Sequence, residues 1–472
     1  MFLLSFLIIP IVAAIALLFI KQDAKAQNLA IGASLLSVMA AIHIIVYNIS
    51  AFDASWLPAL NSRFVLQADG LSKILILLTA ISFPAIFVAT GKNAVAQKNI
   101  NLSLMLFTQA GLMGVFLAGD ALLFYFFWEL ALIPVYFLCS IWGGERRIAV
   151  TFKFFIYTFL GSLFMLIGII MVYTHTKDHS FLIESFKQAS LTSGQQAIAF
   201  CLFFIAFAIK MPIFPLHTWQ PDAYDQAPTS VTMVLSAVMV KMGLYGVIRW
   251  LLPLFPAAAI AHSNLVVTLS IIGILYASFI AIRQDNIKKL IAYSSIAHIG
   301  LMSAAIFTQS AMGMQGVLVQ LFSHGINVLG LWIVADMIEQ QTGTTSLSSM
   351  GGLAKKQPTL AILLVAFSFA NIALPLTNAF VGEFLMFNSL FQFNVWAAVF
   401  AGVSVILAAI YTLNMVQKVA YGEVSAAINR MTTNKSAQVV LIVLLVIVFV
   451  TGVYPQPLFE LTKDTLQQLF VK

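Results

Sequence analysis

Apolar residues run along this chain in stretches of about twenty, separated by short polar segments. A helix needs about that many apolar residues to cross the ~30 Å hydrocarbon core of a bilayer. The pattern therefore predicts an all-α polytopic membrane protein with about fourteen membrane-spanning helices. We expect these spans at residues 2–20, 28–49, 71–91, 102–119, 120–142, 150–174, 197–226, 229–255, 263–283, 288–308, 311–336, 358–391, 394–417 and 436–455.

Two of these runs, 197–226 and 358–391, are too long for one straight helix. Both contain prolines near the middle, and proline removes a backbone donor from the helix ladder. We predict that the seventh and twelfth spans are broken helices, with breaks at Pro212, Pro215 and Pro375. Broken helices at mid-membrane mark ion and substrate pathways in transporters.

The two predicted breaks lie five spans apart, and an odd offset reverses the direction of a repeat in the membrane. Spans four to eight and nine to thirteen are therefore expected to form two inverted five-helix repeats. The corresponding units are residues 1–101 with three N-terminal helices, 102–255 with the first repeat, 256–421 with the second, and 422–472 with the fourteenth helix and a tail.

Composition and charge fit a membrane protein. The 472 residues are 61% hydrophobic and 9% charged, whereas a soluble domain carries about 25% charge. The net charge of +7 does not indicate nucleic-acid binding, because the basic residues lie in short loops. Fifteen Lys and Arg residues, Arg430 among them, fall in loops on one side, and seven, including Lys472, fall on the other. The positive-inside rule then predicts that segments 143–149 and 284–289 are cytoplasmic and both termini are periplasmic.

Six ionisable side chains fall near the middle of predicted spans, where a charge costs at least about 2.5 kcal/mol. They are Glu129, Lys210, Lys241, His298, His324 and Glu383. A single buried histidine is more often structural than a proton carrier, and a buried Glu–Lys pair can be a structural ion pair. Six such groups at one depth are not needed for stability, and together they favour a proton relay.

The charges and the breaks coincide. Pro212 is expected to leave the carbonyl of Ala208 without its usual donor, next to Lys210. Pro375, with Asn378, precedes Glu383 in the same way. Desolvation favours the neutral form of a buried lysine, whereas a nearby carboxylate favours the charged form. Lys210 could therefore be switched by the ionisation of Glu129.

Several stretches resemble the antiporter-like subunits of respiratory complex I (NADH:quinone oxidoreductase) and their relatives in Mrp-type Na+/H+ antiporters. The resemblance rests on residues 207–212 (Phe-Ala-Ile-Lys-Met-Pro), 215–223, 227–229, 240–246, 292–298 and 322–325. Within this family, the acidic Glu383 resembles the subunit M branch, since the sister branches usually carry lysine there. The chain departs from the family at residues 373–376, which read Ala-Leu-Pro-Leu instead of the common Gly-Leu-Pro-Gly. Tyr224 stands where a histidine is frequent.

The resemblance implies that Glu129, Lys210, Lys241 and Glu383 are the principal residues of a proton path, with His298 and His324 linking them. Our hypothesis is that Lys210, influenced by Glu129, passes a proton toward Lys241 and through His298 and His324 to Glu383, which releases it outward. It implies a subunit of a proton-translocating enzyme in the bacterial inner membrane, bound to other membrane subunits of complex I, including neighbouring antiporter-like subunits. NADH, FMN, iron–sulfur clusters and quinone would belong to partner subunits. The sequence shows no G-x-G-x-x-G fingerprint, and its cysteines are Cys139 and Cys201.

Two alternatives remain open. The chain could be a Na+/H+ antiporter subunit of an Mrp-type complex, which gene neighbours would reveal. It could also be a non-transporting membrane scaffold, in which case apolar residues could replace the buried charges at little cost.

Overall fold

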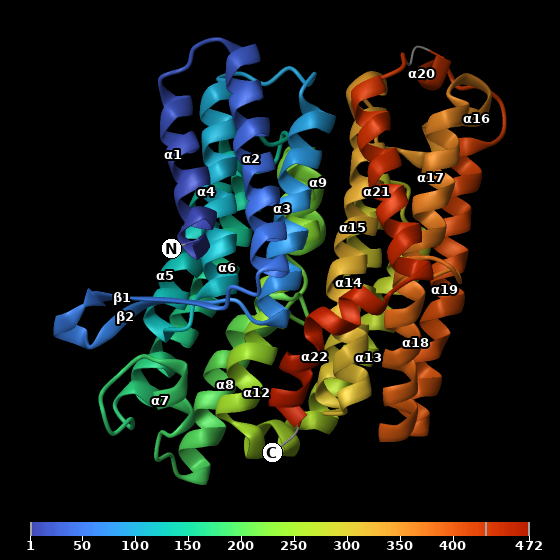
Figure 1. Cartoon of the computed structure of the whole chain (residues 1–472). Helices are drawn as coiled ribbons and strands as arrows, with labels where there is room; N and C mark the ends of the chain where they lie inside the picture. Colours follow the sequence, from blue (N-terminus) through green and yellow to red (C-terminus); the bar gives the residue numbers. More distant parts are fainter. Residues whose placement is uncertain (1, 430–431, 471–472) are drawn as a thin grey trace.

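The computed structural model describes residues 2–429 and 432–470, so Arg430 and Lys472 lie outside the described part of the chain. Long helices stand side by side and form an elongated bundle (Figure 1). The first half contains α1 (Ser5–Leu18), α2 (Asp23–Val46), α3 (Gly70–Thr90), α4 (Lys98–Leu117), α5 (Ala121–Trp142), α6 (Arg147–Tyr173), α7 (Ile183–Lys187), α8 (Ser193–Lys210), α9 (Gln220–Gln226), α10 (Thr229–Val234), α11 (Lys241–Gly246) and α12 (Leu252–Leu254).

The second half continues the same bundle with helices of similar length. It contains α13 (Pro256–Arg283), α14 (Ile287–Phe307), α15 (Ala311–Thr342), α16 (Leu353–Lys356), α17 (Pro358–Asn371), α18 (Asn378–Phe393), α19 (Val395–Ala420), α20 (Ala426–Asn429), α21 (Lys435–Val453) and α22 (Gln456–Phe470). Short 3-10 helices lie at Phe2–Leu4, Pro58–Leu60 and Leu347–Ser349.

The apolar runs become helices close to the predicted bounds. In the part of the chain that the structure describes, twelve helical segments are long and apolar enough to cross a membrane, and two shorter apolar helices are Phe2–Leu18 and Pro358–Asn371. Each of these segments coincides with one of the predicted spans. Polar side chains fix several starts: Asp69 accepts a hydrogen bond from the Ser72 amide at the start of α3, and Asn286 caps α14 through the amides of Lys288 and Lys289.

Three helix ends lie near the predicted unit boundaries. α4 begins at Lys98, within the predicted unit 1–101. α13 begins at Pro256, and α19 ends at Ala420. The division into units itself stays a prediction.

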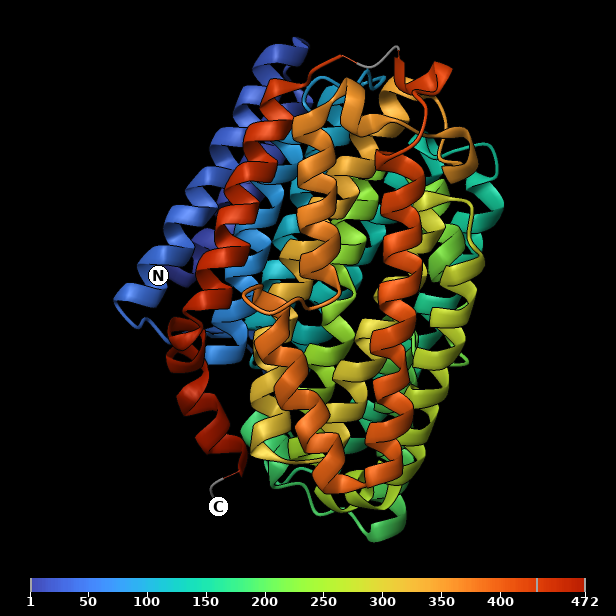
Figure 2. The same cartoon turned by 90° about the vertical axis from the view of Figure 1, so that its right-hand side faces the viewer.

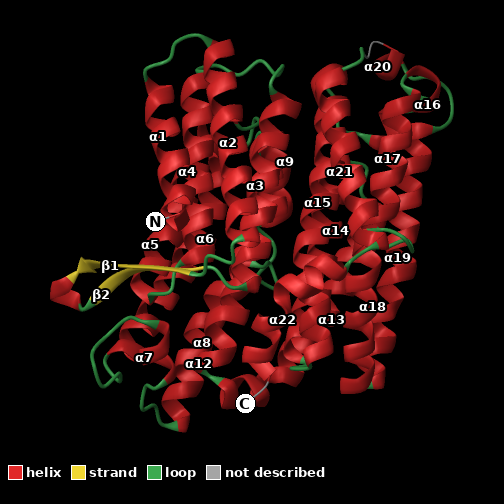
Figure 3. Ribbon diagram, in the orientation of Figure 1, coloured by secondary structure: helices red, strands yellow, loops and turns green. Residues whose placement is uncertain are grey.

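The polar segment between α2 and α3 forms a β-hairpin that the sequence analysis did not predict. Strands β1 (Ala51–Leu57) and β2 (Ser62–Gln67) pair antiparallel, with Ala51 opposite Gln67. The hairpin projects sideways from the helices (Figure 3). Side-chain exposure alternates along β1, which is the period-two pattern of a strand. The same alternation can be read in the sequence, where Phe52, Ala54 and Trp56 are the less exposed residues of the strand.

The expected C-terminal tail is the helix α22. It packs against α3 and α15, and a Cβ atom added at Gly70 would lie 2.3 Å from the carbonyl oxygen of Leu461. Leu458, Thr462 and Thr465 form its buried side. Polar residues between these positions conceal the helix from a search for apolar runs, whereas its 3.6-residue periodicity identifies it.

Both predicted helix breaks are present. The seventh span is divided between α8, which ends at Lys210, and α9, which begins at Gln220. The twelfth is divided between α17, which ends at Asn371, and α18, which begins at Asn378. Figure 2 shows the second interruption about halfway along the bundle. The intervening eighth span is irregular too, with π-helical turns at Leu235–Met239 and Val247–Leu251.

Candidate functional site

A buried lysine and a buried histidine meet at the centre of the bundle. The Nζ atom of Lys241, on α11, donates to the carbonyl oxygen of Ser236 at 2.7 Å and lies 2.9 Å from Nδ1 of His324, on α15. Both side chains are almost completely inaccessible. Ser236 belongs to the π-helical turn before Lys241, where backbone hydrogen bonds run over five residues. The turn thus presents a carbonyl oxygen to the ammonium group.

The line of polar groups continues on the other side of His324. Its Nε2 atom lies 3.3 Å from the hydroxyl of Ser295, and its ring centroid is 5.5 Å from that of His298. His298 Nδ1 lies 3.0 Å from Oε1 of Glu383, on α18. The Gln320 side-chain amide donates to the same oxygen at 3.3 Å. Lys241, His324, His298 and Glu383 therefore form one buried row across α11, α15, α14 and α18.

The order of the two histidines differs from the expectation. The sequence analysis placed His298 before His324 on the way to Glu383, whereas in the structure His324 contacts Lys241 and His298 contacts Glu383. Chain order does not determine this arrangement, because α15 packs against α18 and against the π-helical turn before α11, while α14 packs against α15 and α18. The row therefore crosses from α15 to α14 and then to α18.

A small cavity lies beside the end of this row. It has a volume of about 20 Å³ and is lined by His298 and Glu383 together with the polar side chains of Ser278, Ser404 and Tyr411. A cavity needs about 10–15 Å³ to hold a water molecule, and that water needs polar partners. This one has room for about one water next to the carboxyl group.

Lys210 and Glu129 do not make a direct ion pair among the described residues. Lys210 is buried at the end of α8, with its Nζ atom 5.7 Å from the ring centroid of Trp128 and 5.8 Å from that of Phe154. Such cation–π contacts stabilise the charged form. Glu129 is only half-buried, on a face of α5 that also exposes Phe126. Among the described residues, no hydrogen bond or ion pair joins Lys210 or Glu129 to the row that begins at Lys241.

The first break keeps most of its backbone groups paired. The Ala208 carbonyl, which was expected to lose its usual donor at Pro212, accepts instead from the Ile213 amide at 3.0 Å. The indole of Trp219 donates to the carbonyl of Ile209 at 2.9 Å. The chain turns after Lys210 and brings the next available amide, five residues on, within reach of Ala208. Gly243 of α11 packs closely here, since an added Cβ would lie 2.7 Å from Met211 N.

The second break is held by side chains from α15. The Asn327 amide donates to the carbonyl of Ala370, near the end of α17, at 3.0 Å. The Ser323 hydroxyl donates to the carbonyl of Asn378 at 3.1 Å. The first of these bonds reaches a carbonyl in the last turn of α17, which lacks the internal donor that a continuous helix would supply.

Two residues in the second break adopt left-handed backbone conformations without being glycine. Ala373 has φ 56° and Leu376 has φ 76°. These are the two positions where the family pattern has glycine, so the loop keeps the conformation that glycine favours despite the steric cost of a side chain. The sequence alone left it open whether the break could form without these glycines. In the structure it forms with alanine and leucine at the two positions.

Gln320, Ser323 and Asn327 were not among the predicted site residues. On α15, Gln320 precedes His324 by four residues and Asn327 follows it by three, so Gln320, His324 and Asn327 share one face of the helix. Ser323 is adjacent to His324 in the sequence. This polar spacing inside an apolar span was a signal that could have identified them.

Comparison with known proteins identifies the family. A family model described as "NADH:quinone oxidoreductase/Mrp antiporter, TM" matches residues 118–411, which include all six predicted ionisable residues and both breaks. The chain belongs to this family. Residues 118–411 are well over half of the sequence, and they extend from the start of α5 to the second half of α19.

Several members of the NADH:quinone oxidoreductase/Mrp antiporter family are similar over nearly their whole length. NADH-quinone oxidoreductase subunit M of Rhodobacter capsulatus is 38% identical over 432 residues, covering 88% of this chain and 83% of the relative. Subunit M of Escherichia coli K12 is 36% identical over 438 residues, covering 89% and 86%. Subunit M of Rickettsia bellii is 34% identical over 493 residues, covering 98% and 97%.

Solved structures of the family share the fold. A chain of respiratory complex I from Thermus thermophilus with bound NADH superposes with a TM-score of 0.92 at 27% identity, covering 99% of this chain and 100% of that one. A chain of the Mrp complex from Dietzia sp. DQ12-45-1b superposes with a TM-score of 0.89 at 20% identity, covering 99% and 97%. The second likeness concerns the fold alone.

Proposed function

We propose that this chain is the proton-translocating subunit M of a bacterial NADH:quinone oxidoreductase. The observation that carries the proposal is the buried row Lys241–His324–His298–Glu383, in which neighbouring groups lie 2.9 Å and 3.0 Å apart at the two ends. The relatives named subunit M supply the assignment within the family. The family model covers Mrp antiporters as well, and the likeness to the Mrp complex concerns the fold alone.

The row is suited to pass protons because neighbouring members cannot all be charged at once. A charged Lys241 donates to a neutral His324, and a second positive charge 2.9 Å away in a water-poor interior is strongly disfavoured. A proton that moves to His324 must therefore leave Lys241 neutral. At the far end, a proton on His298 is stabilised by the ionised Glu383 and can be transferred to it.

The step between the two histidines needs a bridge. Their ring centroids are 5.5 Å apart, and the Ser295 hydroxyl lies 3.3 Å from His324 Nε2 on α14, the helix that also carries His298. A hydroxyl can accept one proton while it donates another. We assign Ser295, with ring reorientation of the histidines, to this transfer, and the small cavity beside Glu383 to the release step.

Lys210 and Glu129 would act at the start of the pathway. Lys210 is held by aromatic rings and not by a fixed carboxylate, so its charge depends on how near the ionised Glu129 comes. Glu129 is half-buried, and its Oε1 atom is inaccessible within the subunit. We propose that redox work in partner subunits perturbs this pair. NADH, FMN, iron–sulfur clusters and quinone would be bound by those subunits.

The remaining assignments complete the proposal. The chain would lie in the inner membrane with both termini periplasmic, and α4–α12 and α13–α19 would form the two inverted repeats. The observation that supports the repeat is the placement of a helix break in the fourth helical span of each unit, at residues 211–219 and 372–377.

Affinity purification from the source membrane tests the function. We expect a tagged chain to co-purify with NADH-oxidising subunits, and we expect its deletion to abolish NADH-driven proton pumping by membrane vesicles. Co-purification with Mrp subunits, together with loss of Na+/H+ exchange and intact NADH-driven pumping, would establish the alternative. A scaffold predicts that pumping survives when Lys241 and Glu383 are both made apolar.

A further inference from the structure

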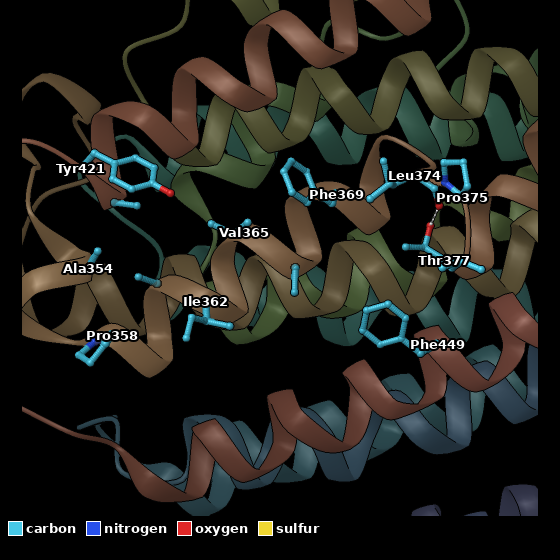
Figure 4. A pocket seen from close by; sticks show the side chains of 14 residues that line it. Ala354, Pro358, Ile362, Val365, Phe369, Leu374, Pro375, Thr377, Tyr421 and Phe449 are labelled. Carbon is cyan, nitrogen blue, oxygen red and sulfur yellow. Dashed lines mark hydrogen bonds between the residues drawn. The ribbon is translucent and has the colours of Figure 1, made fainter.

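An apolar groove follows the outer side of α17, between the end of α19 and α21. Its volume is about 490 Å³, and its walls include small side chains such as Ala361 and Ala366 on α17 and Ala420 at the end of α19. Figure 4 shows Ala354, Pro358 and Tyr421 at one end of the groove, Leu374, Pro375 and Thr377 at the other, and Phe449 of α21 at the side. The Thr377 hydroxyl donates its hydrogen bond to the carbonyl of Leu374 at 2.7 Å, so it has no proton to donate to a ligand in the groove.

The groove has the length of one membrane leaflet. It runs from Pro358, where α17 begins, to the second break, and 14 helical residues are about 21 Å long. Half of the hydrocarbon core is about 15 Å. One end therefore reaches the polar region of the membrane, and the other lies near the midplane.

The lining of the groove suits a hydrocarbon chain. Thr377 and Tyr421 are the lining residues with polar side chains, and the Thr377 hydroxyl already donates to the Leu374 carbonyl. The groove also runs from the polar region of the membrane to near its midplane, as the acyl chain of a phospholipid does. Lining and depth therefore favour an acyl chain.

The polar end of the groove carries basic residues. Lys355 and Lys356 are exposed on α16, directly beside the lining residues Ala354 and Pro358. Two other charges are near: Glu423 is exposed beyond Tyr421, and Lys418 lies 4.0 Å from Asp285. Among the described residues at this rim, the two lysines without an ion pair outnumber the one such carboxylate, so the rim favours an anion. Tyr421 stands at the same level, as aromatic residues do at membrane interfaces.

We propose that this groove binds one acyl chain of an anionic phospholipid, with the phosphate beside Lys355 and Lys356 and the end of the chain against Leu374 and Leu376. The side chains of Leu374 and Leu376 are 45% and 66% exposed, so the bound chain would cover them. Since these residues form the second break, the lipid holds one side of the segment that leads to Glu383. The proposal does not depend on the pumping role.

Photocrosslinking tests the site in the assembled complex. The complex is reconstituted in vesicles that contain phosphatidylglycerol with a diazirine near the end of one acyl chain, and labelled peptides are identified by mass spectrometry. We expect adducts to concentrate between residues 361 and 376 and around Phe449. Labelling spread evenly over other lipid-facing helices such as α2 would overturn the proposal. So would a crosslink from a partner subunit to Val365 that replaces the lipid adduct.

Two variants and one control sharpen the result. Ala366→Trp fills the groove and should remove its adducts while adducts on α2 remain. Lys355→Gln with Lys356→Gln should lower phosphatidylglycerol labelling about fivefold for each charge removed. The control Lys21→Gln with Lys25→Gln removes two exposed lysines beside α1 and α2 and should leave groove labelling unchanged. Equal labelling by phosphatidylcholine and phosphatidylglycerol in the unaltered complex would refute the anionic headgroup.

Discussion

Lys241 Nζ and His324 Nδ1 lie 2.9 Å apart in the buried centre of the protein, which makes them one proton-holding unit. The Ser236 carbonyl is the other acceptor for the ammonium group, at 2.7 Å. These contacts fit a charged Lys241 that donates to a neutral His324, and they favour a single positive charge shared by the pair. Removal of either partner should therefore affect the other.

Lys241→Ala is expected to lower proton pumping at least about a hundredfold, because a positioned proton-transfer group contributes about that much or more. Pumping is measured as acidification of inverted vesicles with NADH and quinone supplied. Lys153→Ala is the matched control, since Lys153 is a half-exposed lysine paired with Asp222 at 3.1 Å and lies outside the row. Normal pumping by an assembled Lys241→Ala complex would show that the lysine is structural.

Glu129→Gln should leave the subunit assembled and severely reduce pumping. Glutamine can hydrogen-bond but cannot change charge, so Lys210 loses the group that favours its charged form. The half-buried position of Glu129 makes the substitution easy to accommodate. The measurement compares NADH-driven pumping with the amount of intact complex in the membrane. A full pumping rate with Gln at this position would contradict the switch.

Glu383 gives an ordered series of variants. Glu383→Gln fixes a neutral side chain beside His298 and should stop turnover, whereas Glu383→Asp keeps the charge, draws it back by one methylene and should retain partial pumping. Glu383→Lys places a cation where the carboxylate lies 3.0 Å from His298, so it should assemble but transfer protons poorly. A structural Glu predicts the reverse: Gln tolerated for pumping and Lys unable to assemble. Quantifying assembly and pumping for all three variants decides between these orders.

Gly452 of α21 should tolerate no side chain. A Cβ atom there would lie 2.3 Å from the carbonyl oxygen of Leu376 and 2.5 Å from the carbonyl carbon of Thr377, within the second break. Gly452→Ala is expected to destabilise the protein by about 1–3 kcal/mol, the usual cost of overpacking. Thermal unfolding of the purified complex measures it. Gly402→Ala, on α19, is the control, because nothing lies within 4 Å of the added atom. Equal unfolding temperatures for the two variants would refute the contact.

The predicted orientation of the chain in the membrane rests on the distribution of its basic residues. A reporter fused at Gly144, between α5 and α6, should read as cytoplasmic, and so should one in segment 284–289. The basis is the fifteen-to-seven division of Lys and Arg between the two sides. A periplasmic signal from the Gly144 fusion would reverse the topology.

Features that depend on local sequence were predictable, and features that depend on packing were not. Runs of apolar residues located the spans, and Pro212, Pro215 and Pro375 located the breaks, because proline alters its own helix. The substitute donor of the Ala208 carbonyl, the Ile213 amide, depends on a turn of the chain that residue spacing does not reveal. The order of His298 and His324 depends on how α11, α14, α15 and α18 pack. The β-hairpin and α22 left weaker periodic signals that a search for apolar runs passes over.

The hydrogen bond from Asn327 to Ala370 has a thermodynamic consequence. Asn327 lies one helical turn from His324 on α15, so the end of α17 and the proton-holding histidine are fixed to one rigid element. If the order of the loop at residues 372–377 changes the proton affinity of His324 by some factor, protonation must change the stability of the ordered loop by the same factor. Proton occupancy and loop order would then be two readings of a single coupling free energy.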